Sequence, residues 1–338
     1  MEQEEEEIHS PVGATTPDGD DGASSAPEKP ASFYEECKSK VSLTLLLSVL
    51  SVACASMAGN AARLALHTAF LSIPFFSTYE FFGPNCIGSF AISFFNSLLP
   101  KEADLPLVVR AISVGFCGSF TTWSSWVVDV TNKDSAGGAF EELLSGITMP
   151  FVFCVWGVDL GLFLHQQGKR FCCSAETASK WLRMVDIAFL SVSIAAAIAI
   201  PIGIQVTVNQ GKIDTISSRD IKAVAIGPAG AVVRFLLSVF LNKREQWHSF
   251  PVGTLLANVL GTFLVVFMDN YSHARPHNAW FWVVQNGICG ALSTVSSFVN
   301  ECVGFKKAGK DRLMYLYALA TLASTVTIAA IGRRSNYN

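Results

Sequence analysis

Long apolar segments alternate with short polar stretches along most of this 338-residue chain, starting near Val41. A helix of about 20 mostly apolar residues is long enough to cross the hydrocarbon core of a bilayer. The pattern therefore predicts an all-α polytopic membrane protein with nine spans. The expected spans are residues 41–59, 74–99, 106–130, 145–166, 184–208, 221–241, 250–269, 279–303 and 313–332. Gly, Asn and Ser interrupt the second and the eighth span, which are therefore less uniformly apolar than the others.

The first 40 residues have a different composition and are expected to form a disordered acidic tail. They hold 11 of the 27 acidic residues of the chain, together with many Pro, Ser and Gly residues. Such a segment has too little apolar surface to offset the entropy of ordering. We do not interpret it as a signal peptide, because it is acidic and the first apolar run begins only near Val41.

The overall composition narrows the class of protein. The chain is 51% hydrophobic and only 15% charged, with a net charge of −3. Soluble domains contain about 25% charged residues, which argues against an ordinary soluble enzyme. No basic face points to a nucleic-acid partner. The nine cysteines form no paired CxxC motif, and Cys172 and Cys173 beside a predicted span leave palmitoylation open.

Lysine and arginine in the loops predict the orientation in the membrane. If the N-terminus is cytosolic, 14 of these residues flank the spans on the inside and 7 on the outside. Because positive residues accumulate in cytosolic loops, the N-terminus is expected inside and the C-terminus outside, which requires an odd number of spans. The sequon at Asn270 then falls in a predicted outside loop, where glycosylation is left open.

Three sequence blocks recur in the same order and indicate an internal duplication. Their offsets are 171 to 173 residues, and the paired blocks are Gly59–Arg63 with Gly230–Arg234, Pro84–Phe90 with Ala257–Phe263, and Gly115–Trp126 with Gly287–Phe298. We expect two inverted four-helix repeats joined by a single linker transmembrane helix, because one inserted span reverses everything after it. The expected domains are the tail 1–40, the first repeat 41–170, the loop and linker helix 171–215, the second repeat 216–333 and a short tail 334–338. Inverted repeats with interrupted helices place ion sites near the bilayer midplane.

The third span of each repeat crowds glycine and hydroxyl residues into an apolar setting. Such residues weaken a helix locally, so a helix break is predicted in each repeat. Open backbone survives in lipid only where it lines a cavity or meets a partner. Close helix packing is the alternative interpretation. The hydroxyl residues concerned are Thr122, Ser124, Ser125, Thr294, Ser296 and Ser297.

Two asparagines recur at matching positions, and three aromatic residues stand in the duplicated third spans. Asn85 and Asn258 lie in apolar segments, where each amide either donates to an anion or forms an interhelical hydrogen bond. Trp123, Trp126 and Phe298 either present positively polarised ring edges to an anion or simply pack in the core. Both pairs of interpretations stay open at this point.

Charged residues inside the repeats are few. Arg63 and Arg234 end the first apolar segment of each repeat, and we expect them to extend to the membrane interface; concentrating anions in a pore mouth is the alternative. Asp129 and Glu301 occupy equivalent positions and are expected to pair with a base or cap a helix. Asp159 and Asp186 have no counterpart in the other repeat.

These motifs closely resemble those of the Fluc/FEX fluoride channels, also called the CrcB-like family. The matching blocks are Gly230–Arg234, Gly253–Phe263 and Gly287–Glu301, and the first repeat supplies Arg63, Asn85 and Gly115–Asp129. The resemblance implies a passive fluoride channel whose pore is lined by the asparagines and the aromatic rings. It also implies a fused pseudo-dimer in a single chain, like the eukaryotic FEX form. A central structural sodium ion would be held by backbone carbonyls of Gly118, Thr121, Gly290 and Ser293.

The chain departs from the family pattern in two places, which bears on the number of pores. The block before Asn85 is changed, and Val295 stands where an aromatic residue is expected. One pathway would then combine Trp123 with Phe298 and the other Val295 with Trp126, and we expect only the first to conduct.

The expected function is fluoride export across the plasma membrane, giving fluoride resistance. A negative-inside potential drives an anion outward with about 2.3 kcal/mol per 100 mV, so no pump is needed, and no phosphate-binding loop motif is present. The main alternative is a proton-coupled small-anion antiporter that uses Asp129 or Glu301. An intramembrane hydrolase using Asp129 and Asp159, and a structural membrane protein without transport, are less favoured. The chain is therefore not expected to be an enzyme.

Overall fold

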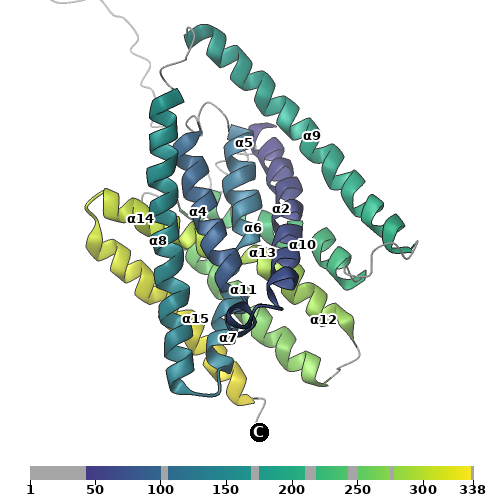
Figure 1. Ribbon diagram of the computed structural model, residues 1–338, viewed down its shortest axis with the longest axis vertical. Helices are drawn as coiled ribbons and strands as arrows, with labels where there is room; N and C mark the ends of the chain where they lie inside the picture. The colour runs from purple at the N-terminus through teal and green to yellow at the C-terminus, as the bar shows by residue number, and fades with distance from the viewer. Residues whose placement is uncertain are drawn as a thin grey trace, which may run out of the picture. The chain divides into compact units, whose positions relative to one another are not determined.

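The computed structural model describes residues 43–99, 106–168, 175–209, 218–242, 250–274 and 278–335, and every secondary-structure element in these ranges is helical (Figure 1). The acidic tail, the Cys172–Cys173 pair and residues 336–338 lie outside the described residues. Six described helices are long and apolar enough to cross a membrane, and they correspond to six of the nine expected spans. The other three, at 74–99, 106–130 and 184–208, stay predictions.

The described part of the first half holds eight helical segments in four groups. α2 spans Leu43–Phe70, and the short α3 (Pro74–Thr78) precedes α4 (Phe82–Leu98). The third group begins with α5 (Pro106–Arg110), continues as a π-helical segment η1 (Ala111–Cys117) and α6 (Gly118–Phe120), and resumes as α7 (Trp123–Asn132). α8 runs over Ala136–Gly168 and packs along α4.

The second half repeats this plan after a separate helix. α9 covers Ala175–Asn209, and α10 covers Ser218–Leu241. α11 follows at Val252–Ala274. The interrupted group consists of α12 (Ala279–Val284), η4 (Gln285–Cys289), α13 (Gly290–Leu292) and α14 (Val295–Lys307), and α15 is Asp311–Ser335.

The ends of several helices differ from the predicted span boundaries, and at the start of α8 a buried charged residue is the reason. The span at 74–99 is divided, because α3 ends at Thr78 and α4 starts at Phe82. α2 continues to Phe70 rather than ending near residue 59. α8 starts at Ala136 instead of 145, since Glu142 interrupts the apolar pattern but is buried beside Lys133, with Nζ 3.5 Å from the carboxylate. Asn270 lies within α11, so the sequon is helical and not in a loop.

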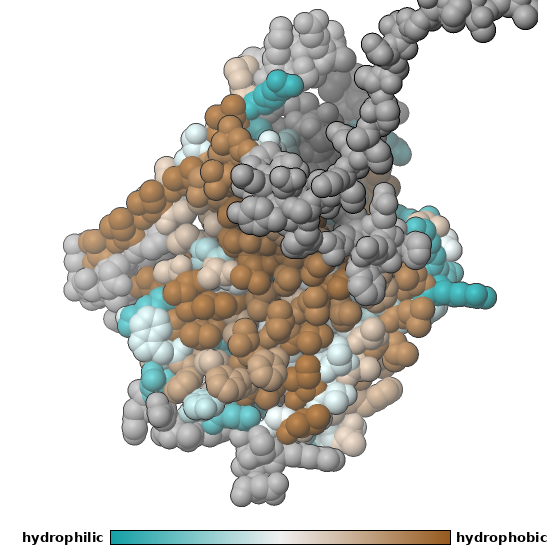
Figure 2. All heavy atoms as spheres, turned by 180° about the vertical axis from the view of Figure 1, so that it is seen from behind, coloured by the Kyte–Doolittle hydropathy of each residue, from teal (hydrophilic) through white to brown (hydrophobic). Residues whose placement is uncertain are grey.

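The outer surface is largely apolar. Figure 2 shows brown hydrophobic atoms over a wide continuous area, with teal polar residues toward its margins. Large exposed side chains come from many helices, among them Leu46 of α2, Phe163 of α8, Phe263 of α11 and Leu319 of α15. An aqueous surface would not favour so broad an apolar area, whereas lipid tails solvate it well. This surface and the six long apolar helices support a multi-pass membrane protein.

α9 is anchored to the first half by a buried carboxylate that sequence analysis left without a role. Asp186 accepts hydrogen bonds from the backbone N–H of Leu107 (3.2 Å) and of Val108 (2.8 Å), at the start of α5. These N–H groups have no partner inside their own helix, because they belong to its first turn. Asp186 therefore caps α5 from another helix, and Phe189 of α9 packs on Val108 and Val109 beside it.

Candidate functional site

Both predicted helix breaks are present, and they cross each other in the interior. Thr121 and Thr122 are extended between α6 and α7, and Ser293 and Thr294 are extended between α13 and α14. All four residues are fully buried. Each break follows a π-helical segment, a rare feature that is frequent at functional sites.

Hydroxyl groups join the two breaks across the repeats in a reciprocal pattern. Thr121 Oγ1 lies 3.0 Å from Ser296 Oγ and accepts from the Ser296 backbone N–H at 3.2 Å. In the opposite direction, Ser293 Oγ lies 2.7 Å from Ser124 Oγ and accepts from the Ser124 N–H at 3.0 Å. Thr121 Oγ1 is also 3.1 Å from Thr294 Oγ1. Neutral hydrogen bonds between hydroxyl and backbone groups therefore join the two breaks directly.

Within each repeat, the threonine that ends the break also bonds to the serine three residues later. Thr122 Oγ1 donates to Ser125 Oγ at 3.1 Å, and Thr294 Oγ1 donates to Ser297 Oγ at 3.4 Å. Ser125 and Ser297 are partly buried, whereas their neighbours Ser124 and Ser296 have no exposed surface. All six predicted hydroxyl residues thus lie around the crossing.

Each asparagine brackets the break of its own repeat. Asn85 Oδ1 accepts from the Thr122 N–H at 3.0 Å, and its Nδ2 donates to the Thr122 carbonyl at 3.2 Å. Asn258 makes the same two bonds with Thr294, at 2.8 and 3.2 Å. The interhelical hydrogen bond is thus the interpretation that the geometry supports. Each Nδ2 carries a second N–H, so donation to an anion stays a prediction.

These brackets change the bonding of two carbonyls on the preceding turn. In a continuous helix the Thr122 N–H would bond to the Gly118 carbonyl, and the Thr294 N–H to the Gly290 carbonyl. Both N–H groups bond to asparagine instead, so Gly118 and Gly290 lose their helical donors. Each repeat therefore has, one turn before its break, a carbonyl oxygen without its helical donor, and carbonyl oxygens are ligands that hard cations accept.

The expectation that the two arginines extend to the membrane interface was wrong. Arg63 lies in mid-helix in α2 and Arg234 in α10, and they are only 3% and 1% exposed. Arg234 Nε donates to the Ala291 carbonyl at 3.0 Å and its Nη2 to the Val114 carbonyl at 2.9 Å. Arg63 donates to the Asn60 side chain and to the Asn286 carbonyl. Backbone carbonyls next to the breaks therefore offset burial of these charges.

The arginines also explain the glycines of the duplicated motif. A Cβ at Gly118 would collide with the guanidinium of Arg234, which comes from the other repeat. A Cβ at Gly290 would likewise collide with the guanidinium of Arg63. Each repeat therefore supplies a glycine that makes room for the arginine of the other.

The three aromatic residues form one buried cluster next to the crossing. The rings of Trp123 and Phe298 meet edge to face with centroids 4.6 Å apart, and those of Trp123 and Trp126 are 5.1 Å apart. Val295 belongs to the same cluster. Core packing is thus what the structure shows, and edge contact with an anion stays a prediction.

A column of polar residues on α15 completes this region and was missed by sequence analysis. Tyr317, Thr321 and Thr325 recur every four residues and have no exposed surface. Thr325 Oγ1 accepts from Trp123 Nε1 at 3.0 Å, and the ring of Tyr317 packs 5.1 Å from that of Phe298. The signal available in the sequence was a four-residue polar period within an apolar helix.

The first repeat has no equivalent column. At an offset of 171 the corresponding positions on α8 are Gly146, Pro150 and Cys154. The indole of Trp126 fills the space next to Gly146, where a Cβ would collide with it. The two sides of the crossing are therefore chemically different.

The two equivalent carboxylates have different partners. Glu301 accepts from Thr254 Oγ1 at 2.7 Å and from the Tyr317 hydroxyl at 2.6 Å. Asp129 pairs with Lys133 at 3.2 Å. Asp159 is exposed on α8, so the structure does not bring it into a buried pair with Asp129.

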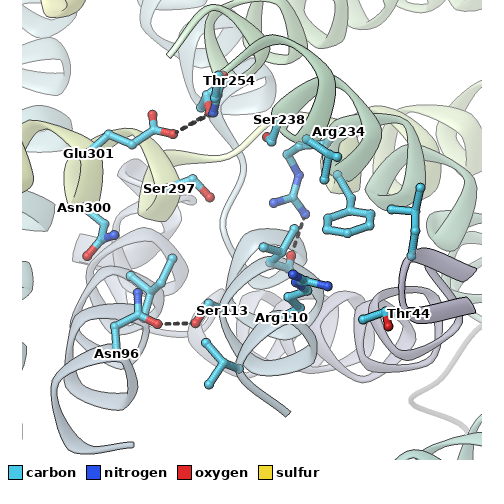
Figure 3. Close-up of a pocket in the computed structure, with 17 residues that line it drawn as sticks. Thr44, Asn96, Arg110, Ser113, Arg234, Ser238, Thr254, Ser297, Asn300 and Glu301 are labelled. Carbon is cyan, nitrogen blue, oxygen red and sulfur yellow. Dashed lines mark hydrogen bonds between the residues drawn. The ribbon is translucent and has the colours of Figure 1, made fainter. Parts of the chain in front are cut away.

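A polar pocket opens beside the crossing, between the two halves of the chain. Figure 3 shows Arg234, Ser297 and Glu301 of the second half facing Asn96 and Arg110 of the first. The cavity volume is about 550 Å³. Its lining includes Ser297, the partly buried hydroxyl residue at the edge of the crossing.

Comparison with known proteins agrees with this duplicated plan. The family model for CrcB-like protein, Camphor Resistance (CrcB), matches twice, at residues 50–162 and 221–333. "Fluoride export protein 1" of Candida albicans is 25% identical over 256 residues, which is 69% of this chain. The match spans 62% of the length of that protein.

Bacterial relatives match over a single repeat. "Fluoride-specific ion channel FluC" of Pectobacterium atrosepticum is 33% identical over 107 residues, covering 31% of this chain and 83% of that protein. The FluC of Elusimicrobium minutum is 31% identical over 106 residues, covering 31% of this chain and 80% of that protein. Among solved structures, none gives a significant match. The two matches to the family model, each with its own break, asparagine bracket and buried arginine, establish that this chain belongs to the CrcB-like family.

Proposed function

We propose that this chain is a fluoride-selective channel that lets fluoride leave the cell passively across the plasma membrane, driven by the membrane potential. The observation that carries the proposal is the crossed pair of breaks, where neutral hydroxyl and amide groups surround the interior. Such donors replace the hydration of a small anion without holding it as a fixed charge would, and conduction needs binding that is weak enough for release. The printed names of the matched relatives agree with this activity.

We assign conduction to one side of the crossing. On that side the aromatic pair Trp123–Phe298 adjoins the hydroxyls of Tyr317, Thr321 and Thr325. On the other side the equivalent helix offers Gly146 and Pro150, and the Trp126 indole fills the space. An anion entering there would meet one indole N–H, that of Trp126, in place of three hydroxyl groups, so it would regain less of its lost hydration in a low-dielectric interior.

The reciprocal contacts support an inverted arrangement within a single chain. Arg63 reaches Gly290 while Arg234 reaches Gly118, and the hydroxyl bonds are exchanged in the same way. Two repeats related by a pseudo-two-fold axis produce such exchanges, and α9 is the extra span that inverts the second repeat. We therefore retain nine spans, a cytosolic N-terminus and an extracellular C-terminus. Tags placed before Val41 and after Arg334 should be accessible from opposite sides, and labelling from the same side would contradict the arrangement.

We also propose a structural sodium ion at the crossing. The carbonyls of Gly118, Thr121, Gly290 and Ser293 would hold it, and two of them have lost their helical donors to the asparagine brackets. The ion would add positive charge beside the guanidinium groups of Arg234 and Arg63, which pack against Gly118 and Gly290. Replacing sodium with a larger monovalent cation at constant ionic strength should lower the thermal midpoint of the purified protein. An equal midpoint in sodium and in a larger monovalent cation would argue against the site.

Fluoride efflux from proteoliposomes tests the activity directly. Purified protein is reconstituted with internal fluoride, and valinomycin with a potassium gradient sets the voltage. Fast efflux that follows the voltage, and no comparable chloride efflux, is the expected result. Efflux no faster than from protein-free vesicles would contradict the proposal.

A proton-coupled antiporter remains the second candidate because Glu301 is a partly buried carboxylate at the edge of the polar pocket. An antiporter would move fluoride in response to a pH gradient at zero voltage. A channel would move it in response to voltage without a pH gradient. Measuring the two conditions separately distinguishes the mechanisms.

A further inference from the structure

The polar pocket beside the crossing is much larger than a fluoride ion requires. Its volume is about 550 Å³, and its walls come from both halves of the chain. Asn96, Arg110 and Ser113 line it on one side, and Arg234, Ser297 and Asn300 on the other (Figure 3). Such a cavity accommodates a polyatomic ion together with water.

Two guanidinium groups, one from each half, line this pocket. Arg110 ends α5, and its Nη1 donates to Ser48 Oγ at 2.6 Å, which fixes the side chain against α2. Arg234 is anchored through Nε and Nη2 to backbone carbonyls, and its buried Nη1 lies against Gly118 without a hydrogen-bond partner among the described residues. Arg110 and Arg234 bring two positive charges to the cavity, and Glu301 is the carboxylate among its described lining residues.

Arg110 has no charged counterpart in the second repeat. At the repeat offset of 172, the counterpart of Arg110 is Trp282, which carries no charge and lies 4.4 Å beneath the guanidinium of Arg219. Arg110 is therefore not part of the duplicated motif, and the breaks do not need it. The ligand preference of the pair Arg110–Arg234 can therefore differ from that of the duplicated crossing.

Guanidinium groups favour oxyanions over spherical ions. Their planar N–H forks match the oxygen spacing of phosphate and bind it in a bidentate manner. Serine, threonine and asparagine side chains around the cavity supply further donors for the remaining oxygens. A phosphate held there is too large to follow fluoride into the buried hydroxyl crossing.

We propose that this pocket is a binding site for a phosphate oxyanion, free or carried by a lipid headgroup, with Arg110 and Arg234 as its cationic ligands. Its occupation blocks anion entry from the pocket side, and this consequence alone rests on the proposed channel function. Binding itself is independent of transport. In the proposed orientation the pocket faces the cytosol.

Thermal unfolding in detergent tests binding without transport. Inorganic phosphate is titrated at constant ionic strength with chloride as the replaced ion, and a ligand that binds only the folded state raises the midpoint. Arg110→Gln should weaken the apparent affinity for phosphate about tenfold, because it removes a charge-assisted pair. Lys306→Gln is the matched control, since Lys306 is exposed, pairs with Asp311 and does not line the pocket. If Arg110→Gln does not yield folded protein, Arg110→Lys replaces it and should weaken binding several-fold.

Fluoride efflux tests the consequence. Phosphate should inhibit efflux through the wild-type protein, and Arg110→Gln should need about ten times more phosphate for the same inhibition. Vesicles of phosphatidylcholine with and without phosphatidic acid distinguish the two sources: inhibition by the lipid without added phosphate identifies a headgroup. A wild-type midpoint that phosphate does not raise, or a response that Arg110→Gln leaves unchanged, overturns the site. Absence of any fluoride efflux from the wild type would instead contradict the channel function, while the thermal titration still decides the pocket.

Discussion

Replacing Asn258 should disrupt the second helix break more than its single amide group suggests. The side chain of Asn258 satisfies both the N–H and the carbonyl of Thr294, at 2.8 and 3.2 Å, and it has no exposed surface. In Asn258→Ala both backbone groups lose their partner in a dry interior. Each unsatisfied group costs about 1–3 kcal/mol, so the expected loss of folding free energy is about 2–6 kcal/mol.

The same change should also alter the ion site. Without the bracket, the Thr294 N–H is free to bond again to the Gly290 carbonyl and extend the helix through the break. Asn258→Asp keeps an acceptor for the N–H but sets a carboxylate oxygen against the Thr294 carbonyl. Both variants should therefore lose most fluoride efflux, the second through electrostatic repulsion as well.

Thermal unfolding in detergent and fluoride efflux from vesicles measure the two effects. Thr262→Val is the matched control, because Thr262 lies one turn away in α11 and is equally buried, and its hydroxyl bonds only to the Asn258 carbonyl of its own helix. The control should behave nearly as the wild type. A wild-type midpoint together with wild-type efflux in Asn258→Ala would refute the bracket.

Three further substitutions follow from the same contacts. Gly118→Ala should lower the thermal midpoint and abolish efflux, because its Cβ collides with the anchored Arg234. Gly304→Ala is the control: Gly304 has open space around it, so the change should be neutral or stabilise the helix by up to about 1 kcal/mol. Equal thermal midpoints in the two variants would contradict the collision. Thr325→Val leaves Trp123 Nε1 without its partner and should cost about 1–3 kcal/mol in unfolding measurements, together with slower efflux; unchanged stability would show that the bond is unimportant. Asp186→Ala removes the cap of α5 and should lower the midpoint, while Asp159→Ala, an exposed change, should not; similar midpoints would exclude a capping role.

The breaks could be predicted because their cause is local. Glycine and hydroxyl residues weaken a helix wherever they stand, and their duplication at a fixed offset showed that Thr121–Thr122 and Ser293–Thr294 were equivalent. The role of Asn85 and Asn258 could be narrowed only to two interpretations. Choosing between them required the backbone positions of the break, which no sequence pattern supplies.

The arginines show where local reasoning fails. A charge near the end of an apolar segment usually reaches the interface. Arg63 stays inside because its guanidinium donates to the Asn286 carbonyl of the other repeat, and that hydrogen bond joins residues 223 positions apart. The α15 column was missed for a related reason: Tyr317 and Thr325 look like ordinary residues of an apolar helix until Phe298 and Trp123 are seen against them.

The hydrogen bonds that each buried arginine forms with the other repeat have a consequence for biosynthesis. Arg63 is made long before its acceptor at Asn286, and ribosomes add about 5–20 residues per second. For about 11–45 seconds the Arg63 guanidinium therefore has the Asn60 side chain of its own helix as a partner but lacks the Asn286 carbonyl. Slower synthesis of the second half lengthens the interval in which this buried charge lacks its acceptor from the other repeat.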